Sequence, residues 1–265
     1  MDKNRLSIYV SSPDSYADVL DVFLQGYRKY WPDCPYEFIL TTNTKQYDGI
    51  NCICNNMTCD TWVERTLAAI PAVKSKYILL MCDDLIISDN VINQDVERVL
   101  DFMDDHNIKY CRLKPFSQGD DCECNLLKWI NKKTPYAINL QIAIIRMDFF
   151  REILGDGTQS AWGLENKFLK ESALAPDENF EDIITVCKPI IPFIHGVYKG
   201  KWIKGSVKAI RKSGIEISTK RDFVPFATEV KMNLIEVIQN NCSPNTRVLM
   251  KKIMKLLGMK FNTDL

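Results

Sequence analysis

Apolar and polar positions along the first 115 residues are grouped in a way that is typical of strands and helices in turn. Short apolar runs at residues 5–11 and 36–40 (YEFIL) flank residues 16–30, whose apolar side chains fall on one helical face. Trp31-Pro32 ends that helix, because the residue before a proline avoids helical geometry. Strand, helix and strand at this spacing predict a right-handed crossover, and therefore a parallel sheet.

The same alternation continues through a helix near residues 62–70, a strand at residues 76–81 (KYILLM), a helix at residues 93–106 and a strand at residues 108–113. The run at 76–81 is apolar on both faces, which is typical of a central parallel strand. Open α/β sheets bind ligands at the carboxyl ends of such strands. Residues 1–115 therefore predict a Rossmann-type half whose binding edge follows these strands.

The chain after residue 115 follows a different pattern. A polar, cysteine-containing excursion is expected at 120–134, followed by a strand at 137–146, a short helix at 148–154 and a longer helix at 160–172. Residues 186–194 contain two prolines, which is typical of irregular backbone or an edge strand. The regular alternation of the first half is therefore not expected to continue here.

Residues 206–265 are expected to form a C-terminal helical extension. Thr246 to Phe261 reads as a basic amphipathic helix, with an apolar stripe and a cationic face. Such a helix can lie in the headgroup region of an anionic membrane. It can equally pack its stripe on the domain and leave its lysines in water, so both interpretations stay open.

Charge and cysteine content narrow the class of protein. Lys+Arg and Asp+Glu both number 34, so there is no basic field to attract nucleic acid. The chain carries neither a signal-peptide pattern nor an apolar stretch of about 18 residues, so we expect a cytoplasmic protein with free thiols. The ten cysteines include C-x-C pairs rather than the C-x2-C pairs of zinc sites, which favours buried thiols over structural zinc.

Asp83-Asp84 is the first candidate for chemistry, because it directly follows the strand at 76–81. Adjacent carboxylates repel each other, and a divalent cation relieves that repulsion while binding phosphate oxygens. The alternative is a helix cap or a solvated turn. The position of the pair directly after a central strand favours a role in ligand binding.

A second group of candidates lies in the later half. Trp162-Gly163-x-Glu165 offers an aromatic face for a sugar and a carboxylate that can take a proton from a hydroxyl, although it can also be an ordinary helix N-terminus capped by Ser160. His195 can ligate a transition metal or be a core or surface histidine. Lys199 and Lys201 follow it on glycine-rich backbone and can reach a diphosphate.

Taken in order, KYILLMCDDLIIS, NLQIAIIRMDFFREIL with SAWGLENKF, and IHGVYKGKW resemble GT-A-type bacterial glycosyltransferases of capsule and lipopolysaccharide clusters. The resemblance implies an α/β, GT-A-like Rossmann-type mixed, mainly parallel sheet flanked by helices. It implies a catalytic domain over residues 1–205, with a nucleotide-sugar-binding half (1–115) and an acceptor-binding half (116–205). The implied activity is transfer of a sugar, from a UDP-sugar by preference, to a glycan or lipid-linked acceptor at the cytoplasmic face of the inner membrane.

The resemblance also implies roles for residues on the donor side. The last aspartate of the family's D-x-D motif corresponds to Asp84, which would bind Mn2+ or Mg2+ together with His195, while Cys82 stands in place of the first aspartate. Asp83 is then the middle residue of the motif and contacts the donor. Three residues at the end of the first strand would hold the base and ribose, and two lysines would hold the diphosphate: Ser11, Ser12 and Asp14, with Lys199 and Lys201.

On the acceptor side, Trp162-Gly163-x-Glu165 is similar to the W-G-x-E segment of β-1,4-galactosyltransferase-like enzymes. That similarity implies that Trp162 and Gly163 contact the acceptor and that Glu165 is the base of an inverting displacement. Two other functions stay open. A nucleotidyltransferase would need a glycine-rich loop after the first strand, which SSPDSYAD lacks. A non-catalytic protein that binds a glycan or a partner stays open because Cys82 stands in the motif.

Overall fold

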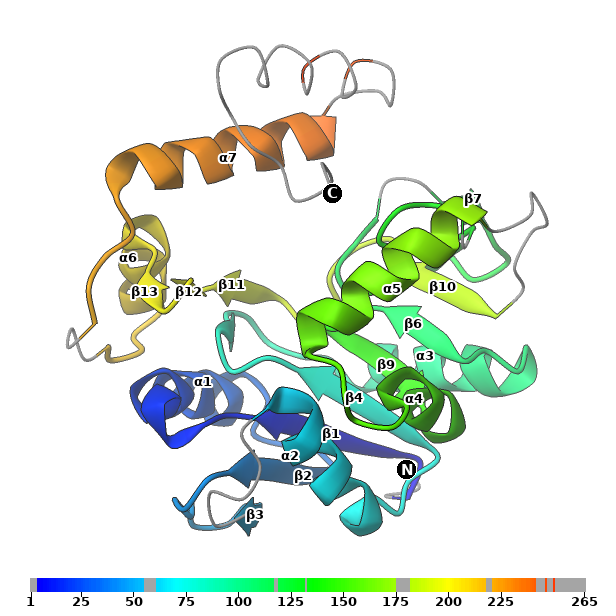
Figure 1. Ribbon diagram of the computed structural model, residues 1–265, viewed down its shortest axis with the longest axis horizontal. Coiled ribbons are helices and arrows are strands. Elements are labelled where there is room, and N and C mark those ends of the chain that lie inside the picture. Colours follow the sequence, from blue (N-terminus) through cyan, green and yellow to red (C-terminus); the bar gives the residue numbers. More distant parts are fainter. Residues whose placement is uncertain are drawn as a thin grey trace.

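The computed structural model describes residues 4–54, 61–116, 119–131, 133–174, 182–217, 221–241, 246 and 250. Over these residues the chain folds around one nine-stranded sheet with the strand order β3-β2-β1-β4-β9-β6-β10-β8-β7 (Figure 1). Seven of the nine strands run in one direction, and only β9 and β8 run against them. The expected mixed, mainly parallel α/β sheet is therefore confirmed.

The first half of the sheet is the regular α/β alternation that the sequence predicts. Thr61 begins α2 with a capping box, in which its hydroxyl accepts from the Glu64 amide and the Glu64 carboxylate accepts from the Thr61 amide. The elements are β1 (Leu6–Ser11), η1 (Asp14–Tyr16), α1 (Ala17–Tyr30), β2 (Glu37–Thr42), β3 (Asn51–Cys54), α2 (Trp62–Ala69), η2 (Ile70–Ala72), β4 (Tyr77–Met81), α3 (Asn93–Asp105) and β6 (Tyr110–Arg112).

The second half extends the same sheet with strands that are short and set by long-range pairing. Its antiparallel strand β9 lies between β4 and β6, and β10 continues the sheet beyond β6. The elements are β7 (Asp120–Asp121), β8 (Leu127–Trp129), β9 (Ala143–Arg146), α4 (Met147–Leu154), α5 (Ala161–Leu174) and β10 (Ile183–Val186).

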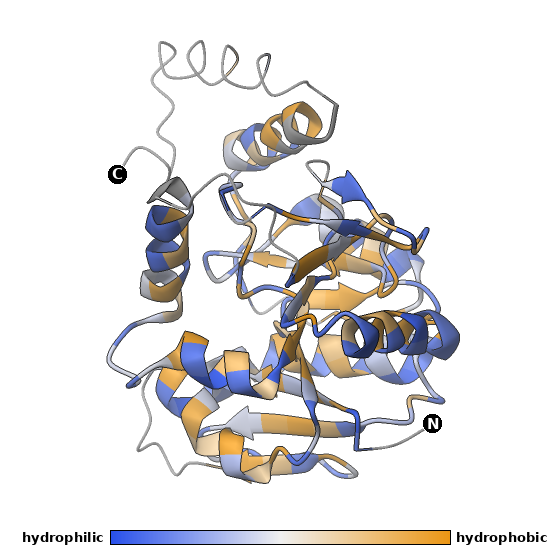
Figure 2. Cartoon of the chain, turned by 90° about the vertical axis from the view of Figure 1, so that its right-hand side faces the viewer, coloured by the Kyte–Doolittle hydropathy of each residue, from blue (hydrophilic) through white to orange (hydrophobic). Residues whose placement is uncertain are grey.

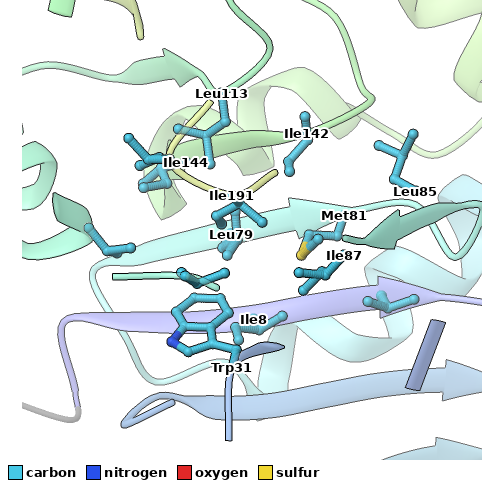
Figure 3. Close-up of a cluster of buried hydrophobic side chains, with 14 of the residues drawn as sticks. Ile8, Trp31, Leu79, Met81, Leu85, Ile87, Leu113, Ile142, Ile144 and Ile191 are labelled. Carbon is cyan, nitrogen blue, oxygen red and sulfur yellow. The ribbon is translucent and has the colours of Figure 1, made fainter. Parts of the chain in front are cut away.

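Side chains alternate between the two faces of the sheet, and each face is covered by helices. On β1, Ile8 belongs to the cluster packed by α1 and α3, whereas the neighbouring Tyr9 belongs to the cluster packed by α2, α4 and α5. Figure 3 shows part of the first cluster, which includes Ile8, Leu79 and Ile144 of three strands together with Trp31. Figure 2 shows the central strands largely in hydrophobic colours and helices that carry both colours. The result is a three-layer α/β/α arrangement.

Four short strands and two helices lie outside the main sheet. Helix α7 lies apart from the sheet and contacts α6, where the Gly205 amide donates to the Glu229 carboxylate at 2.8 Å (Figure 1). These elements are β5 (Leu85–Ile87) paired with β11 (Phe193–His195), β12 (Val197–Tyr198) paired with β13 (Lys201–Trp202), α6 (Lys204–Lys212) and α7 (Phe226–Asn241). In the part of the chain that the structure describes, no helix combines the length and the apolar character needed to cross a bilayer.

The strand expected at 137–146 is shorter than predicted, Ala143–Arg146, and the sequence did not predict four strands of the main sheet: β3, β7, β8 and β10. The expected excursion at 120–134 contains β7 and β8, and the expected irregular segment 186–194 is preceded by a fully buried interior strand, Ile183–Val186. Both prolines of that segment fall after β10, so they do not interrupt it. Strand β3 is present where no strand was expected. The predicted amphipathic helix Thr246 to Phe261 lies outside the described residues except for Thr246 and Met250.

Candidate active site

The carboxyl ends of β1 and β4 are neighbours, because Val10 pairs with Met81 in the parallel ladder. Ser12 therefore lies beside Asp83, and its hydroxyl donates to the carboxylate at 2.5 Å. The Ser12 amide donates to Thr41 O at 2.9 Å, which fixes the turn that follows β1. The turn after β1 and the turn after β4 thus form one edge.

Asp83 is buried, and burial raises the pKa of its carboxyl to about 7. The hydrogen bond from Ser12 opposes this rise, and the negative charge of Asp84 adds to it. The Asp83 carboxyl therefore holds a proton more readily than an exposed aspartate does. Asp84, whose side chain is 25% exposed, is the carboxylate that faces outward.

Strands β5 and β11 bring Asp84 and His195 together, although 111 positions separate them in the sequence. His195 pairs with Leu85 in this ribbon, and its Nε2 lies 3.1 Å from Asp84 Oδ2. The Gly196 amide donates to Asp84 O at 2.7 Å. A Cβ at position 196 would lie 3.0 Å from the Trp202 ring, so glycine allows this close approach.

Asp84 and His195 have the chemistry of ligands for a divalent transition ion, one carboxylate oxygen and one imidazole nitrogen. In this structure the two atoms lie 3.1 Å apart, at hydrogen-bonding distance. Within the described ranges, no group of three His, Cys, Asp or Glu side chains surrounds a common point. Asp84 and His195 are thus two neighbouring groups that can each ligate a divalent ion, and their role as metal ligands stays a prediction.

A second set of contacts ties Glu165 to the same edge. The Cys82 thiol donates to Gln141 O at 3.4 Å, and the neighbouring Leu140 amide donates to Glu165 Oε1 at 2.9 Å. Burial raises the pKa of the Cys82 thiol well above its usual value, and the charges of Asp84, Asp83 and Glu165 add to that rise. All three carboxyl groups therefore act on the half-buried sulfur of Cys82, which places Glu165 near the turn after β4.

The start of α5 distinguishes two interpretations of the Trp162-Gly163-x-Glu165 segment. Ser160 caps the helix, since its hydroxyl accepts from the Gly163 amide at 3.1 Å. A capping box would need Glu or Gln at position 163, three residues after the cap. Glu165 is not part of the cap and bonds to Leu140 instead. Trp162 is 56% exposed, so its indole face is open to a ligand.

Ser11 and Asp14 are occupied by neighbouring parts of the chain. The Ser11 hydroxyl accepts from Arg65 Nε at 3.2 Å. The Asp14 carboxylate accepts from the amides of Asn43, Thr44 and Lys45 and from the Thr44 hydroxyl. Partial desolvation raises the pKa of Asp14, but these hydrogen bonds outweigh it and hold the pKa below its usual value. Asp14 shapes the loop after β2, and its predicted contact to a nucleotide stays a prediction.

Lys199 and Lys201 lie on the tight hairpin that joins β12 to β13. Lys199 and Gly200 have φ values of 49° and 77°, the pattern of a two-residue turn with both central residues left-handed. Lys199 Nζ lies over the Tyr198 ring, 5.6 Å from its centroid, and Lys201 Nζ is 3.3 Å from the Asp222 carboxylate. Both lysines would have to leave these partners to reach a diphosphate.

Arg221 is a site residue that sequence reasoning missed. Its guanidinium binds both oxygens of Asp18 at 2.7 Å, donates to Gly200 O at 3.4 Å and stacks on Tyr16 with 4.2 Å to the ring centroid. Its charge lowers the pKa of Asp83. One arginine thus joins the start of α1 to the hairpin of Lys199 and Lys201. The sequence held no signal for this contact, because 203 positions separate Arg221 from Asp18.

Comparisons with known proteins give structural likeness only. No protein-family model matches the chain, and no curated protein matches it in sequence. The chain is similar to a mannosyltransferase from Pyrobaculum calidifontis in complex with GDP-Man and Mn2+, with a TM-score of 0.46 and 10% identity over 97% of this chain and 81% of that chain. It is also similar to S. aureus TarS 1–349, with a TM-score of 0.41 and 11% identity over 68% of this chain and 60% of that chain.

A nucleotidyl transferase from Methanothermobacter has a TM-score of 0.39 and 13% identity over 70% of this chain and 87% of that chain. The chain spans only 60% of the TarS fragment. At these identities and TM-scores the likenesses assign no activity. The function proposed below therefore rests on the geometry of the site itself.

Proposed function

We propose that this protein is a glycosyltransferase that moves a sugar from a nucleotide-sugar donor to a hydroxyl group of an acceptor. The observation that carries the proposal is the pairing of Asp84 with His195 at 3.1 Å, at the carboxyl end of β4. Glu165 is tied to the same turn through Leu140 and Cys82. Metal-dependent sugar transfer to a hydroxyl uses a pair of metal ligands and a separate carboxylate that acts as the base. Asp84 with His195, and Glu165, supply these groups. The strand order and the site together favour a GT-A-like fold.

The donor would bind along the acidic edge, which consists of Ser12, Asp83, Asp84 and His195. Asp84 and His195 would hold Mn2+ or Mg2+, which when bound stabilises the charge that develops on the leaving diphosphate. Ser11, Ser12 and Asp14, at and just after the end of β1, would hold the nucleoside. Lys199 and Lys201 would add positive charge to the diphosphate once they leave Tyr198 and Asp222.

The acceptor would bind along the α5 edge, which consists of Trp162, Gly163 and Glu165. One oxygen of Glu165 accepts from the Leu140 amide, and the other is left to accept the proton of the acceptor hydroxyl. As that proton moves to Glu165, the hydroxyl oxygen bonds to the anomeric carbon, and the bond from that carbon to the diphosphate oxygen breaks. A single displacement of this kind inverts the anomeric carbon. Trp162 would stack on the apolar face of the acceptor sugar.

The proposed catalytic domain extends beyond residue 205. The expected boundary falls inside α6, and Val207 and Ile210 of that helix are buried in the main core together with Ile215 and Ile217. We place the end of the domain after Ile217 for this reason. The C-terminal extension then begins before α7.

The proposed setting is synthesis of a surface polysaccharide on a lipid-linked acceptor, with a UDP-sugar as the favoured donor. Phe226, Val230 and Leu234 support a peripheral contact with a membrane. They follow one another at intervals of four residues on α7 and are 80%, 48% and 41% exposed. An apolar stripe of this kind, followed in sequence by the basic segment 246–261, suits the headgroup region of an anionic leaflet.

A panel of nucleotide sugars tests the proposed activity directly. The purified chain is incubated with each donor and with oligosaccharide acceptors, with Mn2+ or with a chelator, and the released nucleoside diphosphate is measured. Metal-dependent release with an inverted product supports the proposal. Release of pyrophosphate from a nucleoside triphosphate and a sugar phosphate would indicate a nucleotidyltransferase instead. Binding of glycan without turnover would indicate a non-catalytic protein.

A further inference from the structure

A buried arginine at the carboxyl end of β6 has no role in the function proposed so far. Arg112 is 8% exposed and ends the strand Tyr110–Arg112. Tyr110 belongs to the cluster on the α5 face of the sheet, and side chains two positions apart on a strand share a face. Arg112 therefore points to the same side of the sheet as α5 and Glu165.

The partners of Arg112 do not neutralise its charge. Nε donates to Lys114 O at 3.1 Å, Nη1 donates to Tyr136 O at 2.6 Å, and the guanidinium carbon lies 4.5 Å from the centroid of the Phe116 ring. No carboxylate from the described part of the chain forms an ion pair with it. Burial lowers the pKa of Arg112, and the charges of Tyr110 and Glu165 oppose that change. A guanidinium has five N–H groups, and these contacts use two of them.

Arg112 and Glu165 hold two points of the same loop. Arg112 binds the carbonyl of Tyr136, and Glu165 binds the amide of Leu140, four residues later. Tyr136 has a φ of 62°, in the left-handed region that a tyrosine rarely occupies. The Tyr110 hydroxyl donates to Asn139 O at 2.8 Å and fixes the loop between those points. A strained loop held from three sides places the guanidinium and the carboxylate in one fixed neighbourhood.

A buried positive charge without a carboxylate partner is costly, and proteins retain such groups where a ligand supplies the opposite charge. Arginine also suits this task by geometry, since its planar N–H groups match the two oxygens of a carboxylate or phosphate. The geometry points to an oxyanion subsite at Arg112, beside Glu165, that binds a carboxylate or phosphate group of the acceptor. The assignment of the anion to the acceptor rests on the proposed function. The binding of an anion at the subsite does not depend on turnover.

Matched pairs of small probes test the subsite. p-Nitrophenyl β-glucuronide and p-nitrophenyl β-glucoside differ only in a carboxylate, and glycerol 3-phosphate and glycerol differ only in a phosphate. Binding of each probe to the full chain is measured by calorimetry. We expect at least one charged probe to bind about tenfold more tightly than its neutral partner. Preference for glucuronide identifies a carboxylate ligand, preference for glycerol phosphate identifies a phosphate ligand, and no preference in either pair overturns the inference.

Variants of Arg112 then test whether the tighter binding of the charged probe depends on this residue. Arg112→Gln should remove the tenfold difference between the pair, while Arg112→Lys should keep part of it. Arg146→Gln is the matched control, because Arg146 ends β9, the neighbouring strand, and is paired with Asp148. Its preference should equal that of the natural chain. Thermal unfolding and circular dichroism show whether each variant is folded, and competition by inorganic phosphate in the natural chain gives the same test without any substitution.

Binding of UDP and GDP separates this inference from the function on which it rests. Nucleotide binding by Arg112→Gln should equal that of the natural chain, because Asp84 and His195 are unchanged. Loss of nucleotide binding with an unchanged probe preference would place Arg112 on the donor and overturn the inference. Failure of the natural chain to bind any nucleotide would overturn the proposed glycosyltransferase and leave the anion preference as a separate result.

Discussion

The acidic edge and the α5 edge bury charge in opposite ways. At the acidic edge, Asp83 is a buried carboxyl whose pKa rises to about 7. Protonation removes its charge, and with it the free-energy cost of burying that charge. At the α5 edge, Arg112 is a buried guanidinium that cannot lose its proton in any accessible pH range. Asp83 can become neutral by protonation. Arg112 keeps its charge and can be neutralised only by an anion. The difference teaches that one edge suits a cation and a titrating group, whereas the other suits an anion.

The largest expected effect comes from Asp84→Ala, which removes a carboxylate from the acidic edge and leaves the α5 edge intact. We expect transfer to fall by about 10³-fold or more, because charge stabilisation of this kind contributes several kcal/mol. Nucleotide binding should weaken, and the fold should persist because Asp84 lies on a turn. Steady-state kinetics with Mn2+ and with a chelator measures the effect. Asp89→Ala, at an exposed position after β5, is the control, and equal activity of both variants would remove the metal mechanism.

Glu165→Gln probes the α5 edge in the same manner. The amide keeps the shape and still accepts from the Leu140 amide, but it cannot take a proton. Turnover should fall at least about 10²-fold, with donor and acceptor binding nearly unchanged. Glu171→Gln, on the exposed side of the same helix, should have normal turnover. A loss of tenfold or less, or a product with retained stereochemistry, would argue against direct displacement with Glu165 as the base.

Asp83 should make the metal-free protein less stable as the pH rises. Its folded pKa of about 7 lies above its usual value of 3.8, so the folded chain binds more protons than the unfolded chain between these values. The stability that the protonated carboxyl contributes is complete below about pH 4 and is lost as the pH rises towards 7. From pH 5.5 to 7 this loss is about 1.5 kcal/mol, roughly tenfold in the unfolding equilibrium.

Urea unfolding of Asp83→Asn in chelator checks this expectation. The variant should lack this part of the pH dependence, so its stability relative to the natural chain should increase between pH 5.5 and 7. Ser12→Ala should shift the titration to higher pH, because the hydroxyl that favours the charged form is gone. Parallel pH profiles for all three proteins would show that Asp83 does not titrate in this range.

The smallest expected effect concerns the membrane. Each basic residue near an anionic surface contributes about 1 kcal/mol before salt screening, so attachment through the segment 246–261 should be weak and reversible. Sedimentation with anionic vesicles at physiological salt compares the full chain, a chain that ends at Pro244, and Leu234→Ser in α7. The full chain should pellet most. If all three pellet equally, or none does, neither α7 nor the segment 246–261 is a membrane contact.

The first half of the sheet was predictable because its signals are local. The run at 76–81 is apolar on both faces, and the helix at 16–30 has a single apolar face, so β4 and α1 follow from periodicity alone. Strand β10 was missed because its four residues are placed by β6 on one side and β8 on the other. A strand of this length carries little pattern of its own, and long-range pairing decides its position.

The residues of the candidate site also fall into two groups, those with a local sequence signal and those placed by long-range contacts. Asp83-Asp84 stands out in sequence because it ends a strongly apolar strand, and the structure brings its Asp84 to His195. Arg112, Arg65 and Arg221 could not be found, because an arginine in a sequence reads as a surface residue. Arg112 and Arg65 are buried only because strands and helices from distant parts of the chain close around them. The sequence shows that Cys82 stands in place of the first aspartate of the D-x-D motif. Its link to Leu140 and Glu165 is visible only in the structure.

The raised pKa of the half-buried Cys82 thiol has a practical consequence for labelling the protein. Electrophilic reagents such as maleimides react with thiolates, and a thiol whose pKa is raised well above its usual value supplies almost none at neutral pH. Cys187, by contrast, is exposed just beyond β10. Among the cysteines that the structure describes, Cys187 is the exposed one, so a fluorophore should attach there faster than at the half-buried Cys82. The label would report ligand-induced changes from a strand that borders β6 without altering the chemistry being observed.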